Sequence, residues 1–197
     1  MLRDTNSNKV FKPLGFGQNT VRKENDFYPT PTHTTQALLD KVNFDNNVWE
    51  CACGDGAISK VLLQNKYNVL SSDLVNRSYG IQANFLNFSS FINAKKSEYD
   101  IITNPPFKLF EEFIIQAKKL AKNKIAMLGR IQILKGISRY DNLFCDIKNK
   151  DFPLSKVIVF SKRVNNLNDK SSAMCFCWFI WDKSHIGKPI IDWFNPH

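Results

Sequence analysis

The stretch of residues 48–56, VWECACGDG, decides the predicted fold. A short apolar run ends there at a glycine-rich turn, and residues 57–65 follow with apolar side chains near helical spacing. Glycines allow the unusual backbone dihedrals that such a turn needs. We therefore expect a buried strand over 48–53 that leads through a tight turn into a helix over 57–65.

The same alternation of strand and helix continues along the chain. The expected strands cover 48–53, 68–74, 99–103, 124–128, 155–160 and 173–181. The expected helices cover 33–41, 57–65 and 109–121, with Thr32 as the cap of the first. This alternation predicts an α/β fold, a mostly parallel sheet with helices on both faces. The last two strands have no helix between them, which favours an antiparallel hairpin at the sheet edge.

Size and composition fit one globular domain. The chain has 197 residues, of which 43% are hydrophobic and 23% charged. We expect a flexible arm over 1–25 and a single domain over 26–197. No apolar run is long enough for a transmembrane helix, and the polar start does not resemble a secretory signal, so we expect a cytoplasmic protein with no membrane partner.

The formal net charge of +9 favours polyanionic partners. Five cysteines, an odd number without a signal peptide, argue against a disulfide framework. Both Cys-x-Cys pairs lie within apolar, strand-like runs, whereas structural zinc sites space their thiols further apart on a turn. We therefore expect no metal and inert thiols.

Three candidate sites follow predicted strands, and ligands of open parallel sheets bind beyond the carboxyl ends of the strands. In the first, Glu50 precedes Gly54 and Gly56, which would let a ligand approach the backbone. The third glycine of a nicotinamide fingerprint is absent, and the loop is not a phosphate-binding P-loop. Glu50 suits a ligand that carries positive charge. The alternative is an ordinary strand-to-helix turn.

The second candidate is Asp73, at the end of the next predicted strand. A carboxylate in this position can accept hydrogen bonds from both hydroxyls of a ribose. Its distance from the glycine loop, just under twenty residues, favours that role. The alternative is a turn residue or a helix cap, which is common for aspartate.

The third candidate is Asn104-Pro105-Pro106-Phe107, after the predicted strand 99–103. Consecutive prolines make the turn rigid. Such a turn can hold the Asn104 side-chain oxygen and the Pro105 carbonyl side by side, as two acceptors for the N–H bonds of one planar amine. Phe107 can stack on the ring that carries the amine. The alternative is a structural proline turn.

These residues resemble a known family. Residues 104–107 are similar to the catalytic tetrapeptide of amino-group methyltransferases that act on adenine, cytosine or glutamine amides, and the glycine loop resembles their S-adenosyl-L-methionine loop. Residues 26–31 resemble the Tyr-Pro-Thr-Pro stretch of small phage-type adenine-specific DNA methyltransferases, and residues 136–140, GISRY, resemble their Gly-x-x-x-Arg-Tyr stretch. The chain departs from the family at Cys51, where a proline is usual, and at Asn84, where an aspartate is often found.

The resemblance implies a Rossmann-like class I methyltransferase with a mostly parallel, seven-stranded sheet and an antiparallel edge hairpin. It also implies S-adenosyl-L-methionine as cofactor. Gly54 and Gly56 would pass close to its methionine part, Asp73 would hold the ribose, and Leu74 and Asn84 would contact the adenine. The implied cofactor-binding residues are Tyr28, Pro29, Thr30, Pro31, Glu50, Ala52, Cys53, Gly54, Gly56, Asp73, Leu74, Asn84, Phe85 and Asn104. The implied catalytic residues are Asn104, Pro105, Pro106 and Phe107.

The implied activity is methylation of the N6 amine of adenine in DNA, with the target base flipped out of the duplex. Basic and aromatic residues after later strands would contact the nucleic acid: Lys135, Arg139, Tyr140, Lys162 and Arg163. The alternative for each is a solvated basic face. Sequence specificity would rest on the short loops 132–150 and 162–172. The recognised DNA sequence and the oligomeric state are not deducible from the sequence.

Three other functions fit part of this pattern. An RNA adenine methyltransferase would share every core motif, and only residues 28–31 favour DNA. A protein glutamine methyltransferase more typically has tyrosine in place of Phe107 and a helical domain before the glycine loop. A catalytically inactive nucleic-acid-binding module would have no reason to keep the Asn104 tetrapeptide.

Overall fold

The computed structural model describes residues 28–90, 98–145, 148–162, 164 and 175–195. The expected arm over 1–25 lies outside these residues, as does Arg163. The helices and strands in chain order are α1 (Thr32–Leu39), β1 (Asn47–Glu50), α2 (Ala57–Gln64), β2 (Asn68–Asp73), β3 (Ile81–Gln82), η2 (Phe85–Ser90), β4 (Asp100–Thr103), η3 (Phe107–Leu109), α3 (Phe110–Leu120), β5 (Lys124–Arg130), η4 (Ile131–Leu134), α4 (Ile137–Arg139), η5 (Tyr140–Phe144), β6 (Leu154–Phe160), β7 (Phe176–Asp182) and β8 (Ile190–Phe194).

The described strands form one sheet of eight, in the order β3-β2-β1-β4-β5-β7-β6-β8. The strands β3, β2, β1, β4 and β5 are parallel, and β7 runs antiparallel to both β5 and β6. The predicted α/β sheet, parallel for the most part, is confirmed. The carboxyl ends of the parallel strands all lie at the same end of the sheet. We call this end the carboxyl edge, as distinct from the outermost strands β3 and β8.

The predicted antiparallel pairing of the last two expected strands is confirmed, because β6 and β7 are antiparallel neighbours. Their predicted place at the sheet edge is wrong. β7 inserts between β5 and β6, and β8 pairs parallel with β6 to form the edge. The predicted count of seven strands also missed β8, whose residues Ile190 and Trp193 are exposed. Long-range pairing decides both features, and the short-range pattern of side chains does not encode it.

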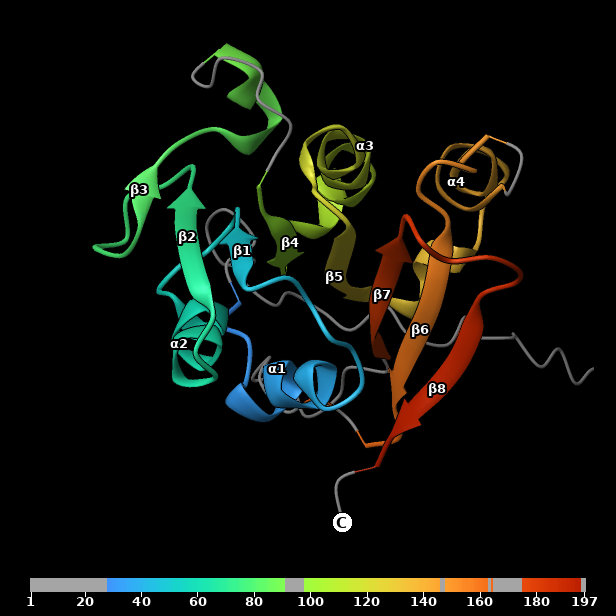
Figure 1. Ribbon diagram of the computed structural model, residues 1–197, viewed down its shortest axis with the longest axis horizontal. Helices are drawn as coiled ribbons and strands as arrows, with labels where there is room; N and C mark the ends of the chain where they lie inside the picture. The colour runs from blue at the N-terminus through green and yellow to red at the C-terminus, as the bar shows by residue number, and fades with distance from the viewer. Residues whose placement is uncertain (1–27, 91–97, 146–147, 163, 165–174, 196–197) are drawn as a thin grey trace, which may run out of the picture.

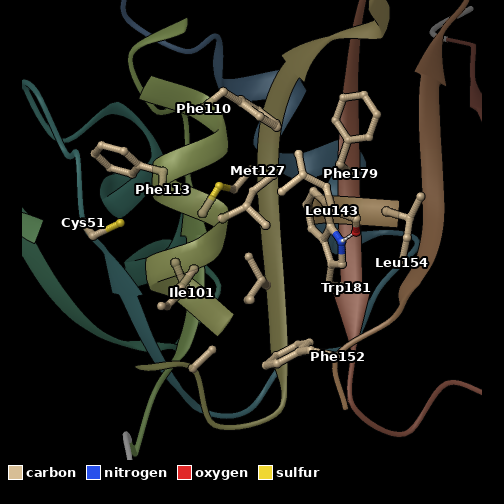
Figure 2. Packing of buried hydrophobic residues seen from close by; sticks show 14 of the residues in the cluster. Cys51, Ile101, Phe110, Phe113, Met127, Leu143, Phe152, Leu154, Phe179 and Trp181 are labelled. Atoms are coloured by element: carbon tan, nitrogen blue, oxygen red, sulfur yellow. Dashed lines mark hydrogen bonds between the residues drawn. The ribbon is translucent and has the colours of Figure 1, made fainter. Parts of the chain in front are cut away.

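Helices cover both faces of the sheet, as predicted. Figure 1 shows α3 and α4 on one side and α1 and α2 on the other. Two buried clusters match these faces. One joins α3 residues such as Phe113 to Met127 and Trp181 of the sheet, and the other joins Leu38 of α1 and Ile58 of α2 to Trp178. Figure 2 shows the first cluster, with Phe110 and Phe113 of α3 against the sheet.

Two details of the helices differ from expectation. Thr32 is the first residue of α1 and does not cap it. The cap position is taken by Pro31, and no side chain accepts a hydrogen bond from the backbone N–H groups of the first helical turn. In α3 the sequence spacing predicts a buried face of Leu109, Phe113, Ala117 and Leu120, whereas the buried residues are Phe110, Phe113, Ile114 and Ala117. The buried set follows the i, i+3, i+4, i+7 spacing of an amphipathic helix.

Within the described residues, no helix is both long enough and apolar enough to cross a bilayer.

Candidate active site

A cleft opens at the carboxyl edge, where β1, β2 and β4 end. Its empty volume, counted out to its open mouth, is about 960 Å³. We call it the main cleft. The predicted site residues that line it are Tyr28, Pro29, Thr30, Glu50, Ala52, Cys53, Asp73, Leu74, Asn84, Phe85, Asn104 and Pro106. The structure therefore brings together side chains from five separate segments that the sequence singled out.

The main cleft also has walls that the sequence analysis missed. These residues are Cys51, Asp55, Ala57, Val75, Arg77, Leu86, Leu109 and Phe113. Most of them are chain neighbours of predicted residues. Ligands of open parallel sheets bind beyond the carboxyl ends of the strands, and this principle would have found these residues if it had been applied to whole loops. Phe113 lies on α3, and no local signal indicates that it reaches the cleft.

The glycine loop adopts the turn that its sequence predicts. Gly54 and Gly56 both have positive φ, at 55° and 80°. A Cβ atom on Gly56 would lie 2.4 Å from the ring of Tyr79, so only glycine fits there. The two glycines do not themselves line the main cleft; their neighbours Cys53, Asp55 and Ala57 do. Close approach of a ligand to the glycine backbone stays a prediction.

Glu50 is buried at the base of the main cleft, with 1% of its surface exposed. Its Oε2 accepts hydrogen bonds from the backbone N–H of Ser59, at 2.7 Å, and from the Ser59 hydroxyl. Burial raises the pKa of Glu50 to about 8, while the bonds from Ser59 oppose that rise. A positive charge in the cleft would favour the ionised carboxylate, so the position suits a cationic ligand.

Asp73 lies opposite the glycine loop at the end of β2. Its Oδ2 accepts from the backbone N–H of Gly54, and its Oδ1 accepts from that of Val75, both at 2.8 Å. These bonds fix the carboxylate between two loops of the cleft. Each oxygen has a second lone pair, so the carboxylate can still accept from two neighbouring hydroxyls.

Leu74 and Asn84 border the same part of the main cleft. Leu74 is 60% exposed, so its side chain offers an uncovered apolar surface to a ligand. Asn84 Oδ1 accepts from the backbone N–H of Leu86 at 3.0 Å, an Asx turn that opens η2. The Asn84 oxygen is thus partly used by its own loop, which the sequence analysis did not foresee.

Asn104, at the end of β4, has a fixed orientation. Its Nδ2 donates to Thr30 Oγ1 at 3.1 Å and to the Tyr28 carbonyl at 3.3 Å. Because a carbonyl oxygen only accepts, the amide nitrogen must face Tyr28 and the amide oxygen must point elsewhere. That oxygen is buried and has no hydrogen-bond partner among the described residues. A buried acceptor without a partner indicates a missing donor.

A second, smaller hollow lies beside Asn104. We call it the side pocket, and it is lined by Tyr28, Pro29, Thr30, Pro31, Asn104, Phe107, Leu128, Val164 and Phe176. Its walls are largely apolar and aromatic. Asn104 and residues 28–30 line both hollows, so they separate the main cleft from the side pocket.

Phe107 already has close partners in the side pocket. Its ring stacks on that of Tyr28, with centroids 5.8 Å apart, and lies 5.6 Å from that of Phe176. The guanidinium of Arg130 lies 4.4 Å from the same centroid. The rings of Tyr28 and Phe107 are too close to admit a third ring between them. Arg130 was not predicted, although it is the last residue of β5, at the carboxyl edge.

The contacts that hold residues 28–31 over Asn104 start in the core. The indole N–H of Trp178 in β7 donates to the Thr34 carbonyl of α1 at 2.8 Å. This bond and the buried Leu38 fix α1 beneath the sheet. Because residues 28–31 lead directly into α1, they are placed across the end of β4.

The predicted nucleic-acid-binding residues within the described part of the chain are exposed. Lys135, Arg139 and Tyr140 lie after β5, and Lys162 follows β6. Both strands run parallel to β4, so all four residues lie at the carboxyl edge. A bound nucleic acid at these residues stays a prediction.

The cysteines are free thiols where the structure describes them. Burial raises the pKa of Cys53 and of Cys177 to about 12, and that of Cys51 is also raised. Within the described ranges, no cluster of three or more His, Cys, Asp or Glu side chains could hold a metal ion. Cys51, Cys53 and Cys177 are therefore poor nucleophiles at neutral pH.

No protein-family model and no curated protein matches the chain. Solved structures share its fold. A protein described as a modification subunit of a type I restriction enzyme from Vibrio vulnificus YJ016 is 14% identical, with a TM-score of 0.56, over 86% of this chain and 47% of that one. The 23S rRNA methyltransferase ErmE is 10% identical, with a TM-score of 0.54, over 83% and 71%.

A third structure is magnesium protoporphyrin IX methyltransferase from Synechocystis PCC 6803 with SAM bound. It is 13% identical, with a TM-score of 0.51, over 78% of this chain and 79% of that one. These likenesses show that the chain has the Rossmann-like fold of class I methyltransferases. The chain spans about half the length of the restriction-enzyme subunit. One of these proteins is a 23S rRNA methyltransferase and another a magnesium protoporphyrin IX methyltransferase, so the fold alone does not identify the substrate.

Proposed function

We propose that the chain is an S-adenosyl-L-methionine-dependent methyltransferase that acts on the N6 amine of adenine in DNA. The observation that carries the proposal is the buried, unpartnered oxygen of Asn104, held between the main cleft and the side pocket. It supplies an acceptor where two ligands, one in each hollow, would meet.

The residues of the main cleft fit the cofactor. Asp73 would accept from the ribose hydroxyls, Leu74 would pack on the adenine, and Glu50 lies where a positive charge would favour its ionised form. When bound, S-adenosyl-L-methionine supplies a methyl group activated by its sulfonium. After transfer the methylated amine is positively charged and loses one proton to water, so no step requires a metal ion or a strongly basic side chain.

The chain's own contribution is alignment and electronic tuning of the amine. The Asn104 oxygen accepts one amine N–H, and the Pro105 carbonyl accepts the other. Both bonds draw the nitrogen lone pair out of conjugation with the ring and leave it directed at the main cleft. Thr30 and Tyr28 hold the Asn104 amide so that its oxygen cannot exchange places with its nitrogen.

The side pocket supports a flat aromatic substrate. Its walls include Tyr28, Phe107, Leu128 and Phe176. Because the rings of Tyr28 and Phe107 are in contact, an incoming base must displace one of them or stack from the open side. Aromatic stacking would offset part of the stacking that a flipped base loses in DNA.

Two observations favour a nucleic acid over a small molecule or a protein. The net charge is +9, and exposed basic residues lie at the same edge of the sheet as the side pocket. The structural neighbours include a protein described as a modification subunit of a restriction enzyme. Among nucleic acids, the resemblance of residues 28–31 to adenine-specific DNA methyltransferases favours DNA.

The experiment that tests the proposal is transfer of a tritiated methyl group to duplex DNA, RNA and protein in parallel, with Asn104→Ala as the inactive control. We expect label in DNA, on adenine N6 after nucleoside analysis. Label in RNA or protein but not in DNA would overturn the substrate. Unchanged transfer by Asn104→Ala would overturn the mechanism.

A further inference from the structure

The segment that links β5 to β6 presents an unusual surface at the carboxyl edge. Three apolar side chains, Leu134, Ile137 and Tyr140, are exposed there, and they alternate with the exposed cations Lys135 and Arg139. We call these five residues the rim surface.

The rim surface is fixed next to the candidate active site. Its segment begins directly after Arg130, whose guanidinium contacts the ring of Phe107. Asn142, just beyond the rim surface, donates to Glu111 Oε1 of α3 at 2.8 Å. The next residue, Leu143, is fully buried in the core next to Phe179 and Trp181 (Figure 2). The amino group of Lys118 in α3 donates to the Leu143 carbonyl at 3.3 Å. Because α3 follows residues 104–107, these contacts hold the rim surface beside the tetrapeptide.

Ile137 is the most exposed apolar side chain of the rim surface, at 86%. Gly136, with a φ of 125°, precedes it, and the Tyr140 N–H donates to the Gly136 carbonyl at 2.9 Å. The guanidinium of Arg139 also braces the turn, because its Nη1 donates to the Lys135 carbonyl at 3.0 Å. A braced turn thus holds an isoleucine out in water, which is unfavourable unless a partner covers it.

The chemistry of the rim surface matches one partner, a nucleic acid duplex. A duplex has an anionic backbone outside and an apolar stack of bases inside. Lys135 and Arg139 can face phosphates, while Ile137 between them can enter the stack. The acidic Asp141 nearby lies 3.8 Å from the amino group of Lys148, so part of its charge is balanced.

We propose that the rim surface docks duplex DNA and that Ile137 enters the base stack, where it fills the space left by the flipped adenine. This inference rests on the proposed function and extends it from a substrate base to a duplex. Ile137 is a positioning residue: it does not touch the reacting atoms, and it stabilises the open duplex while the adenine occupies the side pocket.

The test compares Ile137→Ser with the wild type on three DNA forms: a matched duplex, the same duplex with an abasic site opposite the target adenine, and the single strand. A side chain that enters the base stack, called here a wedge, matters only where the base pair of the target adenine must be opened. We therefore expect a fall of about tenfold or more on the matched duplex and a change of less than about twofold on the other two forms. Ile137→Leu should restore transfer to the matched duplex.

A matched control is Ile186→Ser. Ile186 is 94% exposed in the turn between β7 and β8. Because β7 runs antiparallel to β5, this turn lies at the opposite edge of the sheet. The control variant should behave as wild type on all three DNA forms.

A second measurement does not depend on methyl transfer. With 2-aminopurine in place of the target adenine, unstacking raises fluorescence, and Ile137→Ser should reduce that rise on the matched duplex. Equal losses on all three DNA forms, or no loss on the matched duplex, would overturn the wedge and leave the proposed function standing. Failure of the wild type to label any DNA form would instead overturn the proposed function itself.

Discussion

The main cleft and the side pocket meet at Asn104, but they are built differently. In the main cleft, the backbone holds the polar groups in place: Ser59 binds Glu50, and Gly54 and Val75 bind Asp73. In the side pocket the walls are apolar and packed on one another. The main cleft therefore needs little rearrangement to bind the proposed cofactor, whereas the side pocket must rearrange to admit an aromatic ring.

The comparison predicts that changes on the two sides of Asn104 separate into effects on turnover and effects on cofactor affinity. Asn104→Ala should show the largest effect, a loss of about 10²- to 10³-fold in the rate of methyl transfer, because a fixed acceptor is removed from the amine. The dissociation constant of S-adenosyl-L-methionine should change by less than about tenfold. Single-turnover kinetics and calorimetry measure the two quantities.

Asn43→Ala serves as the control for that variant. Asn43 is exposed and precedes β1, at the opposite edge of the sheet. If Asn104→Ala weakened the cofactor as much as it slowed transfer, the division between the two hollows would be wrong.

Asp73→Asn should act in the main cleft, on the affinity for the cofactor. An amide keeps the shape of the carboxylate but replaces one accepting oxygen by a donor, so either Gly54 N–H or Val75 N–H loses its partner. We expect the cofactor to bind about 10- to 100-fold more weakly. Calorimetric titration with S-adenosylhomocysteine measures this change. Asp40→Asn, an exposed charge at the end of α1, should leave affinity unchanged.

Much of this division is visible in the sequence, because it is local. Glu50 and Asp73 are the last residues of their strands and Asn104 directly follows one, so the alternation of strand and helix was enough to bring them to one edge. What the sequence did not indicate depends on contacts between distant segments. The side-chain bond from Asn104 to Thr30 joins positions 74 residues apart, and no spacing rule encodes it.

Two other misses have the same origin. β7 lies between β5 and β6 because its apolar residues on both faces are covered, as in the fully buried Trp178 and Trp181. Lys118 lies off the apolar face that the sequence spacing predicts for α3, yet its amino group donates to Asn149 Oδ1 and to the Leu143 carbonyl. Burial lowers the pKa of Lys118 to about 8. Each feature follows from packing against chain that is remote in sequence.

Thr30→Val tests how far orientation alone matters at the junction. Valine matches the shape of this buried threonine but cannot accept from Asn104 Nδ2. The freed amide can turn its oxygen away from the amine, so kcat should fall about 5- to 10-fold with the cofactor affinity preserved. Thr32→Val, on the exposed start of α1, is the matched control. A fall in affinity without a fall in kcat would contradict the assigned role.

The last expected effect is on stability and not on turnover or affinity, and it concerns Glu50 and pH. The pKa of Glu50 is raised to about 8 by burial, with Asp55 and Asp73 adding to the rise. Between about pH 4.5 and pH 8 the folded protein therefore retains a proton that the unfolded chain releases, and the free energy of unfolding falls as pH rises through that window. Glu50→Gln lacks this titration.

Relative to the wild type, the variant should gain about 4 kcal/mol in free energy of unfolding between pH 5 and pH 9, because each pH unit between the two pKa values is worth about 1.4 kcal/mol. Urea unfolding at the two pH values measures the difference. A gap between variant and wild type that stays constant with pH would show that Glu50 is ionised in the folded protein throughout.

The locked amide of Asn104 has a consequence for when the proposed reaction stops. Its nitrogen is committed to Tyr28 and Thr30, so its outward-facing atom is always an acceptor. An amine that has received one methyl group retains a single N–H and can satisfy only one of the two waiting oxygens. The methylated base therefore binds more weakly than the starting base. Weaker binding favours its release after one methyl transfer and makes a second transfer to the same amine slow.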